Sequence, residues 1–193
     1  MGVKRVWIIE KGNSRWKIGE FNDDALINVT TTDVGVVLTD LNLPKSDSKS
    51  IDILITGSGN WSNDTLELLK SKGNVTQLRH GDSHPLRTNV TNPGSLGTDR
   101  IANAFAIQEG VIDEALTGNA WLIVDVGTCV TFDLVVDGTH LGGAISPGIS
   151  LRLDSMRIGT AALKEVTKDV WNKKAPFKGE TTGLSSEEAQ IKG

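Results

Sequence analysis

One short pattern occurs twice in this chain of 193 residues, and it limits the folds that the chain can adopt. In each copy an apolar run ends in a carboxylate, which is followed by any residue, a glycine, a small hydrogen-bonding residue and a second extended run. The copies occupy residues 10–17 and 125–131. Because a glycine between two extended runs is typical of a hairpin turn, each copy predicts two adjacent antiparallel strands.

The residues of these turns suit a phosphate-containing ligand. Glycine lets the backbone come close to a ligand, and turn N–H groups together with a hydroxyl or an amide can hold phosphate oxygens. A carboxylate is repelled by phosphate, so Glu10 and Asp125 are better placed on a cation or on water bound to Mg²⁺. Two such hairpins could clamp a nucleotide from both sides. The alternative is two ordinary glycine turns, and the repetition favours the nucleotide.

The rest of the chain alternates predicted strands and helices, which indicates an α/β fold. Asp137-Gly138 predicts a type I′ hairpin turn, and Ser185 opens a capping-box pattern for a final helix. Strands are predicted at residues 6–10, 16–21, 51–56, 121–126 and 130–136, with short extended pieces at 75–78 and 86–90. Helices are predicted at residues 62–71, after 97–99 and from 149, the last after a glycine-rich return at 142–148.

A second motif, residues 96–100, holds an aspartate and an arginine at a predicted helix start. The positive end of a helix dipole favours the charged form of the Asp99 carboxylate. In a kinase such a carboxylate can accept the proton of the substrate hydroxyl during phosphoryl transfer. Arg100 could bind a substrate carboxylate with two parallel hydrogen bonds. The alternative is that Asp99 caps the helix and that Arg100 is solvated.

Composition excludes several classes of protein. Apolar residues make up 38% of the chain, enough to bury a core, and a net charge of −4 argues against a dedicated nucleic-acid binder. The single cysteine cannot build a disulfide framework. No apolar run approaches the roughly 20 residues of a membrane span, and the N-terminal apolar stretch is too short for a signal peptide. We therefore expect a cytoplasmic protein with neither nucleic acid nor membrane among its partners.

Taken together, the motifs resemble those of type III pantothenate kinases, in the acetate-kinase/sugar-kinase/Hsp70/actin superfamily. The resemblance rests on Gly12-Asn13-Ser14, Pro93 with Leu96-Gly97-Thr98-Asp99-Arg100, Asp125-Val126-Gly127-Thr128, Thr131 with Asp133, and Gly142-Gly143 with Pro147-Gly148. It implies an α/β fold of two ribonuclease-H-like (actin-like ATPase) halves, each a mixed sheet flanked by helices, at residues 1–115 and 116–193. The halves would meet at a cleft between residues 10–17 and 125–131.

The resemblance also implies an activity, which is ATP-dependent phosphorylation of pantothenate to 4'-phosphopantothenate, the first step of coenzyme A biosynthesis. Asp99 would be the proton acceptor, Asp125 would bind a monovalent cation (K⁺ or NH4⁺), and Mg²⁺ would arrive with ATP. The residues implied for ATP are Glu10, Gly12, Asn13, Ser14, Lys17, Gly127 and Thr128. Those implied for pantothenate are Val90, Gly97, Thr98, Asp99, Arg100 and Ser186. The family commonly forms homodimers, so a homodimer is expected.

Four features depart from the family pattern. Glu10 stands where aspartate is usual, Val90 stands where tyrosine is usual, and Lys11 occupies a normally small or apolar position. Family members also usually continue through a helix, a strand with a glycine-rich turn and a last helix, so the second half is expected to be incomplete. These departures leave two alternatives open. One is a non-catalytic, nucleotide-binding regulatory homologue, and the other is a superfamily kinase that acts on another small hydroxyl compound.

Overall fold

The computed structural model describes residues 4–33, 51–57, 59–111, 117–167, 169–171 and 185–192. The chain forms two compact units, one made of Met1–Trp121 with Leu134–Gly142 and the other of Leu122–Asp133 with Gly143–Gly193. The domain boundary expected near residue 115 falls at residues outside the described ranges, so the division into residues 1–115 and 116–193 stays a prediction.

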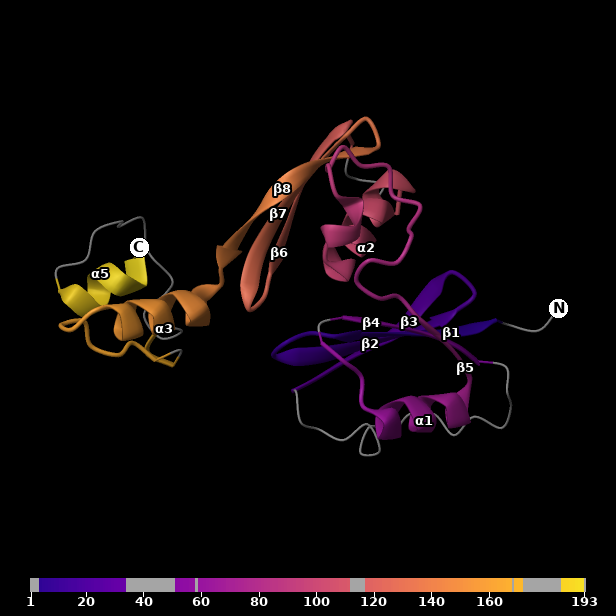
Figure 1. Ribbon diagram of the computed structural model, residues 1–193, viewed down its shortest axis with the longest axis horizontal. Helices are drawn as coiled ribbons and strands as arrows, with labels where there is room; N and C mark the ends of the chain where they lie inside the picture. Colours follow the sequence, from indigo (N-terminus) through magenta and orange to yellow (C-terminus); the bar gives the residue numbers. More distant parts are fainter. Residues whose placement is uncertain are drawn as a thin grey trace. The chain divides into compact units, whose positions relative to one another are not determined.

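A five-stranded mixed sheet forms the centre of the first unit (Figure 1). Its order is β3-β2-β1-β4-β5, and β2 runs antiparallel to both β1 and β3, whereas β1, β4 and β5 are parallel. This order and direction are those of a ribonuclease-H-like sheet, as expected from the sequence. The strands are β1 (Arg5–Lys11), β2 (Arg15–Asn22), β3 (Ala25–Asp33), β4 (Ile51–Gly57) and β5 (Asn74–Gln77).

Helix α1 (Asn63–Lys72) packs against one face of this sheet (Figure 1). Side chains alternate between the two faces of a strand, so every second residue of β1, β2 and β4 points toward the helix. Ser62 caps α1 as predicted, because its Oγ accepts a hydrogen bond from the Thr65 N–H at 3.2 Å. The buried core on this face consists of Trp7, Ile9, Ile18, Ile51, Ile53, Ile55, Trp61 and Leu69.

Two strands were not predicted. Strand β3 lies at the edge of the sheet and keeps most of its side chains exposed, so its residues do not show the apolar alternation of a half-buried strand. It follows a turn in which Asp23 adopts a positive φ of 51°. Strand β8 (Thr139–Pro147) contains the predicted glycine-rich return and is extended throughout. In both cases pairing with a neighbouring strand outweighs weak local preference.

Helix α2 spans Thr98–Gln108. The segment between β5 and α2 is held in place by hydrogen bonds such as those that join the backbone of His140 to Arg87 and Asn89. The predicted extended piece at residues 86–90 makes one parallel bridge, between Thr88 and His140, rather than a full strand. The buried His140 ring nitrogen Nδ1 lies 2.9 Å from Thr88 Oγ1. After the short helix η1 (Pro93–Ser95), α2 begins as predicted and contacts β4.

The second sheet contains β6 (Ala120–Val126), β7 (Cys129–Val136) and β8 in that order. Asp137 and Gly138 both have positive φ, 47° and 68°, which confirms the type I′ turn between β7 and β8. Helix α3 (Ile149–Gly159) follows β8 directly. The described residues form a mixed five-stranded sheet and a three-stranded sheet flanked by helices, so the α/β prediction is confirmed.

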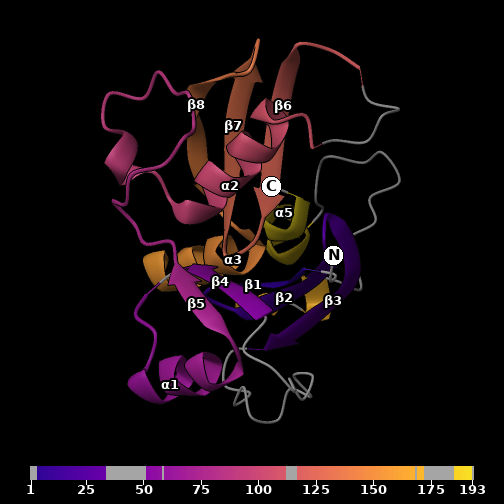
Figure 2. The same ribbon diagram turned by 90° about the vertical axis from the view of Figure 1, so that its right-hand side faces the viewer.

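Helices α3 and α5 (Ser186–Lys192) lie side by side in the second unit (Figures 1 and 2). Leu153, Val166 and Ile191 form their common core. The predicted cap of α5 is present, because Ser185 Oγ accepts a hydrogen bond from the Glu188 N–H at 3.1 Å. Among the described residues, no helix has the length and apolar character needed to cross a membrane.

Candidate functional site

The first predicted phosphate turn is a tight hairpin between β1 and β2. The Gly12 N–H donates a hydrogen bond to the Arg15 carbonyl oxygen at 2.9 Å. A Cβ on Gly12 would lie only 2.7 Å from that oxygen, so the close approach of the two strands requires glycine here. Asn13 and Ser14 are exposed at the tip. The nucleotide contacts expected of Gly12, Asn13 and Ser14 stay predictions.

The second turn is also closed by its glycine, but with a tighter hydrogen bond, to the residue two positions further on instead of three. The Gly127 N–H donates to the Cys129 carbonyl oxygen at 2.9 Å, and the Gly148 N–H donates to the Thr128 carbonyl oxygen at 2.9 Å. A Cβ on the buried Gly148 would collide with the carbonyl oxygens of Gly127 and Thr128. The Gly148 N–H therefore links the turn to the start of α3 by a hydrogen bond. A glycine follows Pro147 because any side chain there would collide with the turn.

Glu10 and Lys17 face each other across the first hairpin. They are paired residues on β1 and β2, and Lys17 Nζ lies 3.2 Å from Glu10 Oε2. The two side chains remain accessible, with exposed fractions of 54% for Lys17 and 30% for Glu10. An acidic and a basic group thus stand together beside the turn and form an ion pair with each other.

Lys11 points to the other face of the sheet, away from that pair. Its Nζ donates a hydrogen bond to the Asn60 carbonyl oxygen at 2.6 Å. The same ammonium group lies 5.9 Å and 5.8 Å from the ring centroids of Trp16 and Trp61, within the range of a cation–π interaction. The centroids of the two rings lie 5.2 Å apart, in an edge-to-face arrangement. Lys11 therefore ties the hairpin to the segment before α1, which accounts for a lysine at a position that is usually small or apolar.

Asp99 lies in the first turn of α2. The alternative considered for this residue, that it caps the helix, is not what the structure shows. Gly97 is the N-cap residue, so Asp99 is the second helical residue and does not cap the helix. A Cβ on Gly97 would collide with Asp99 Oδ1, which means that the carboxylate folds back over the Gly97 backbone. The side chains of Leu96, Ile101 and Ala104 are buried and anchor this turn. The glycine of the motif leaves the space that the carboxylate occupies.

The other residues predicted to bind the substrate lie in both units. Thr98 is buried and Arg100 is half-buried at the start of α2. Val90 is half-buried, and its Cγ2 lies 3.9 Å from the position of a Cβ on Gly142 in β8. Ser186 is exposed at the first position of α5, in the second unit. That these groups line one cleft with the two turns stays a prediction.

Asp125, the predicted ligand of a monovalent cation, is half-buried near the end of β6. Within the described ranges, no group of three or more His, Cys, Asp or Glu side chains is arranged to hold a metal ion. Any oxygen ligands beyond the Asp125 carboxylate would therefore have to come from backbone carbonyls, hydroxyls, water or a bound nucleotide.

Thr56 is a polar residue near the first turn that the sequence analysis did not select. It precedes the last residue of β4, directly beside Glu10 in the parallel register of β1 and β4. The residue is 7% exposed, and its buried Oγ1 has no hydrogen-bond partner in the described part of the chain. No spacing rule points to it, because it lies 46 residues after Glu10 and the sheet alone brings the two together.

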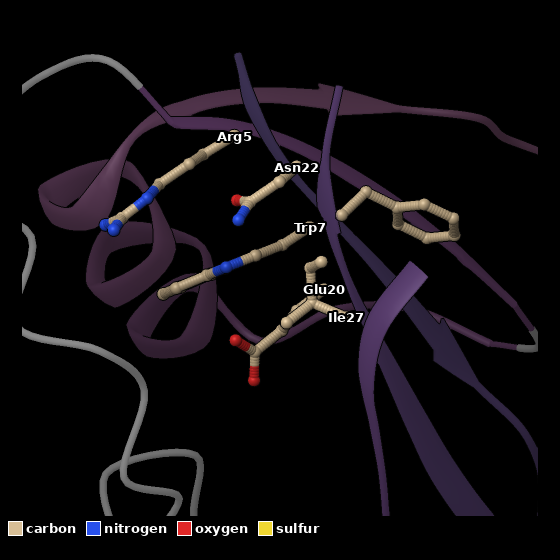
Figure 3. A pocket seen from close by; sticks show the side chains of 6 residues that line it. Arg5, Trp7, Glu20, Asn22 and Ile27 are labelled. Atoms are coloured by element: carbon tan, nitrogen blue, oxygen red, sulfur yellow. The ribbon is translucent and has the colours of Figure 1, made fainter. Parts of the chain in front are cut away.

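A shallow hollow of about 150 Å³ lies at the opposite end of the same hairpin (Figure 3). Arg5 pairs with Asn22 at that end, whereas Lys11 pairs with Trp16 at the turn. None of the residues predicted to bind ATP or pantothenate is among those that line it, which are Arg5, Trp7, Glu20, Phe21, Asn22 and Ile27. We therefore do not assign the hollow to the predicted site.

The architecture has a structural counterpart at low sequence identity. A conserved protein from Campylobacter jejuni, assigned to the Baf family of transcriptional activators, superimposes with a TM-score of 0.55 and 18% identity. The match covers 96% of this chain and 72% of that protein. At this identity the similarity establishes a shared α/β fold and nothing about activity.

Sequence comparison identifies the family to which this α/β protein belongs. Residues 6–188 match the family model of type III pantothenate kinase, and the chain belongs to that family. Curated type III pantothenate kinases are similar to it. The one from Flavobacterium psychrophilum is 29% identical over 161 residues, which are 82% of this chain and 65% of the relative. The one from Phocaeicola vulgatus is 31% identical over 121 residues, 62% of this chain and 47% of the relative.

A third type III pantothenate kinase, from Christiangramia forsetii, is 39% identical over 100 residues, which are 51% of this chain and 39% of the relative. The chain therefore spans about half the length of the curated relatives that it matches. The family resemblance seen in the motifs is confirmed by these matches.

Proposed function

We propose that this protein phosphorylates pantothenate to 4'-phosphopantothenate with ATP, the first step of coenzyme A biosynthesis. The observation that carries the proposal is the start of α2, where Gly97 leaves room for the Asp99 carboxylate to fold back over the backbone. A carboxylate held in this way is oriented before the substrate arrives, which is what a proton acceptor needs. Membership of the type III pantothenate kinase family supports the choice of substrate.

The two glycine turns would hold the nucleotide. Asn13 and Ser14 at the first tip, and Gly127 with Thr128 at the second, would contact phosphate oxygens. Lys17 would place its ammonium group on a phosphate, and Glu10 would accept hydrogen bonds from water on Mg²⁺. The donor set fits a magnesium nucleotide, since hard oxygen ligands, a cation and a buried hydroxyl without a partner in the described ranges stand in one region. When bound, Mg²⁺·ATP supplies the phosphoryl group.

The α2 motif would hold and activate the acceptor. Arg100 would bind the pantothenate carboxylate, and Asp99 would take the proton of the hydroxyl that attacks the phosphoryl group. Gly97, Thr98, Val90 and Ser186 would line the remainder of the substrate site. Because valine has neither the ring nor the hydroxyl of tyrosine, the pocket beside Val90 would be wider and less polar than in relatives that carry tyrosine there.

A monovalent cation, the oligomeric state and the location complete the proposal. Asp125 would bind K⁺ or NH4⁺ near the second turn and offset the negative charge of the nucleotide. We propose a cytoplasmic homodimer as the working form. These points rest on the family resemblance.

A second candidate is a nucleotide-binding protein without kinase activity. The ion pair between Glu10 and Lys17 favours it, because each group neutralises the other in the free protein. A glutamate is also one methylene longer than the usual aspartate. The third candidate, a kinase of another small hydroxyl compound, is favoured by Val90 alone.

Coupled ADP release by the purified chain tests these candidates. The assay contains ATP, Mg²⁺ and K⁺, with and without pantothenate, and is repeated with Na⁺ in place of K⁺. We expect pantothenate-dependent ADP release that falls in Na⁺. Asp99→Asn is expected to lower turnover by about 10²–10⁴-fold with nucleotide affinity nearly unchanged, because it removes a general base and leaves the turns intact. Nucleotide binding without turnover would support the second candidate, and loss of affinity in Asp99→Asn would contradict the role of Asp99.

A further inference from the structure

Three polar side chains form a row across neighbouring strands of the first sheet. Glu10 on β1 is paired with Lys17 on β2 and with Thr56 on β4. Paired residues of adjacent strands project to the same face, so the three side chains stand on the face opposite the α1 core. The row lies at the carboxyl ends of the parallel strands β1 and β4, where open α/β sheets bind their ligands.

Thr56 differs from the other two members of this row. Its side chain is buried at 7% exposure, and Oγ1 is fully enclosed with no hydrogen-bond partner in the described part of the chain. Buried hydroxyls nearly always have a partner in a folded protein, and one without a partner destabilises it. The Thr56 hydroxyl, enclosed beside a carboxylate, therefore indicates that its hydrogen-bond partner belongs to a ligand and is present only when that ligand is bound.

We propose that Thr56 is a further nucleotide-binding residue, whose hydroxyl hydrogen-bonds an oxygen of the magnesium–phosphate group beside Glu10. The inference rests on the proposed binding of Mg²⁺·ATP. The hydroxyl can donate to a phosphate oxygen or accept from a water molecule on the metal, and Glu10 can only accept. Thr56 thus adds to the site a donor that the two turn motifs do not account for.

This role predicts opposite effects on stability and on binding. Thr56→Val keeps the shape of the side chain and removes the hydroxyl. The free protein should then melt about 2–4 °C higher, because a buried unsatisfied group is lost. Affinity for the magnesium complex of a non-hydrolysable ATP analogue should fall about tenfold, the loss expected for one hydrogen bond to a charged group. A threonine that serves only the fold would show a lower melting temperature in Thr56→Val and unchanged affinity.

The experiment measures melting temperature and analogue affinity by calorimetry for the wild type and three variants. Thr56→Ser retains the hydroxyl and should keep the wild-type affinity. Thr76→Val is the matched control, since Thr76 lies on the same face at β5, paired with Leu54, and is exposed. It should change neither quantity. Equal affinity of Thr56→Val and wild type would overturn the inference alone, whereas absence of binding by the wild type would overturn the proposed function as well.

Discussion

At the residue scale, three glycines define the shape of the predicted site. Gly12, Gly97 and Gly148 each stand where a Cβ would meet a specific oxygen atom. In each case the oxygen belongs to a predicted site segment or to the residue next to one. These three glycines are therefore explained by close approach of oxygen atoms, and none of the three needs a positive φ.

Gly97→Ala tests whether the space left by the missing Cβ of Gly97 positions the Asp99 carboxylate for the proposed proton transfer. The new Cβ would collide with Asp99 Oδ1, so the carboxylate must rotate away from its position. We expect the rate of pantothenate-dependent ADP release to fall about 10²-fold, because catalysis is sensitive to displacements of about 1 Å. The melting temperature should change little, since alanine at an N-cap costs only about 1 kcal/mol or less relative to glycine. A variant with wild-type turnover would contradict the positioning of Asp99 by Gly97.

At the residue scale, the two lysines of the first hairpin, Lys11 and Lys17, also differ in their surroundings. Lys17 lies beside Glu10 on the face of the predicted site, and Lys11 lies between two tryptophans on the other face. The sequence shows both as cations near a glycine turn. Only the strand register shows that Lys17 lies on the face of the predicted site and that Lys11 packs between the two tryptophans.

At the element scale, strands with continuous apolar runs and helices with clear caps were predictable. β1, β4, β6 and β7 agree with the sequence analysis, as do α1, α2 and α3, because their signals are local. β3 was missed because its stability comes from pairing with β2 at the edge of the sheet. The segment at residues 86–90 shows the converse, since it pairs with β8 only through the bridge between Thr88 and His140 and does not become a strand.

The joint between β8 and α3 offers a test at this scale. In Gly148→Ala the Cβ would collide with two carbonyl oxygens of the second turn, so the turn must move or the helix must shift. We expect a free energy of unfolding lower by about 1–3 kcal/mol and weaker nucleotide binding. Gly159→Ala is the control at the other end of α3, where a Cβ meets nothing within 4 Å. Thermal unfolding and calorimetry measure both effects, and equal behaviour of the two variants would refute the role of Gly148.

At the scale of the whole molecule, the two turns belong to different units. Residues 10–17 and Asp99 lie in the first unit, and Asp125 with Thr128 lies in the second. The proposed reaction requires both, since one unit would hold the proton acceptor and the other would hold the monovalent cation. The family match extends over both units, from residue 6 to residue 188.

Asp125→Asn tests this dependence. The variant removes the negative charge that would bind K⁺, so its turnover in K⁺ should fall about tenfold, to the level that the wild type shows in Na⁺. Replacement of K⁺ by Na⁺ should then have no further effect on the variant. A variant that still responds to the exchange of cations would place the cation elsewhere. Steady-state ADP release in matched chloride salts gives the answer.

The sequence by itself determined the α/β class, the two glycine turns, the helix starts and the family, because each depends on residues close together in the chain. Only the tertiary structure decided which side chains meet. Thr56 stands beside Glu10, Lys11 turns toward Trp61, and Asp99 folds over Gly97 instead of capping its helix. The first two depend on strand register and long-range pairing, which no local pattern encodes. The third depends on one missing Cβ, whose effect appears only when atoms are placed in space.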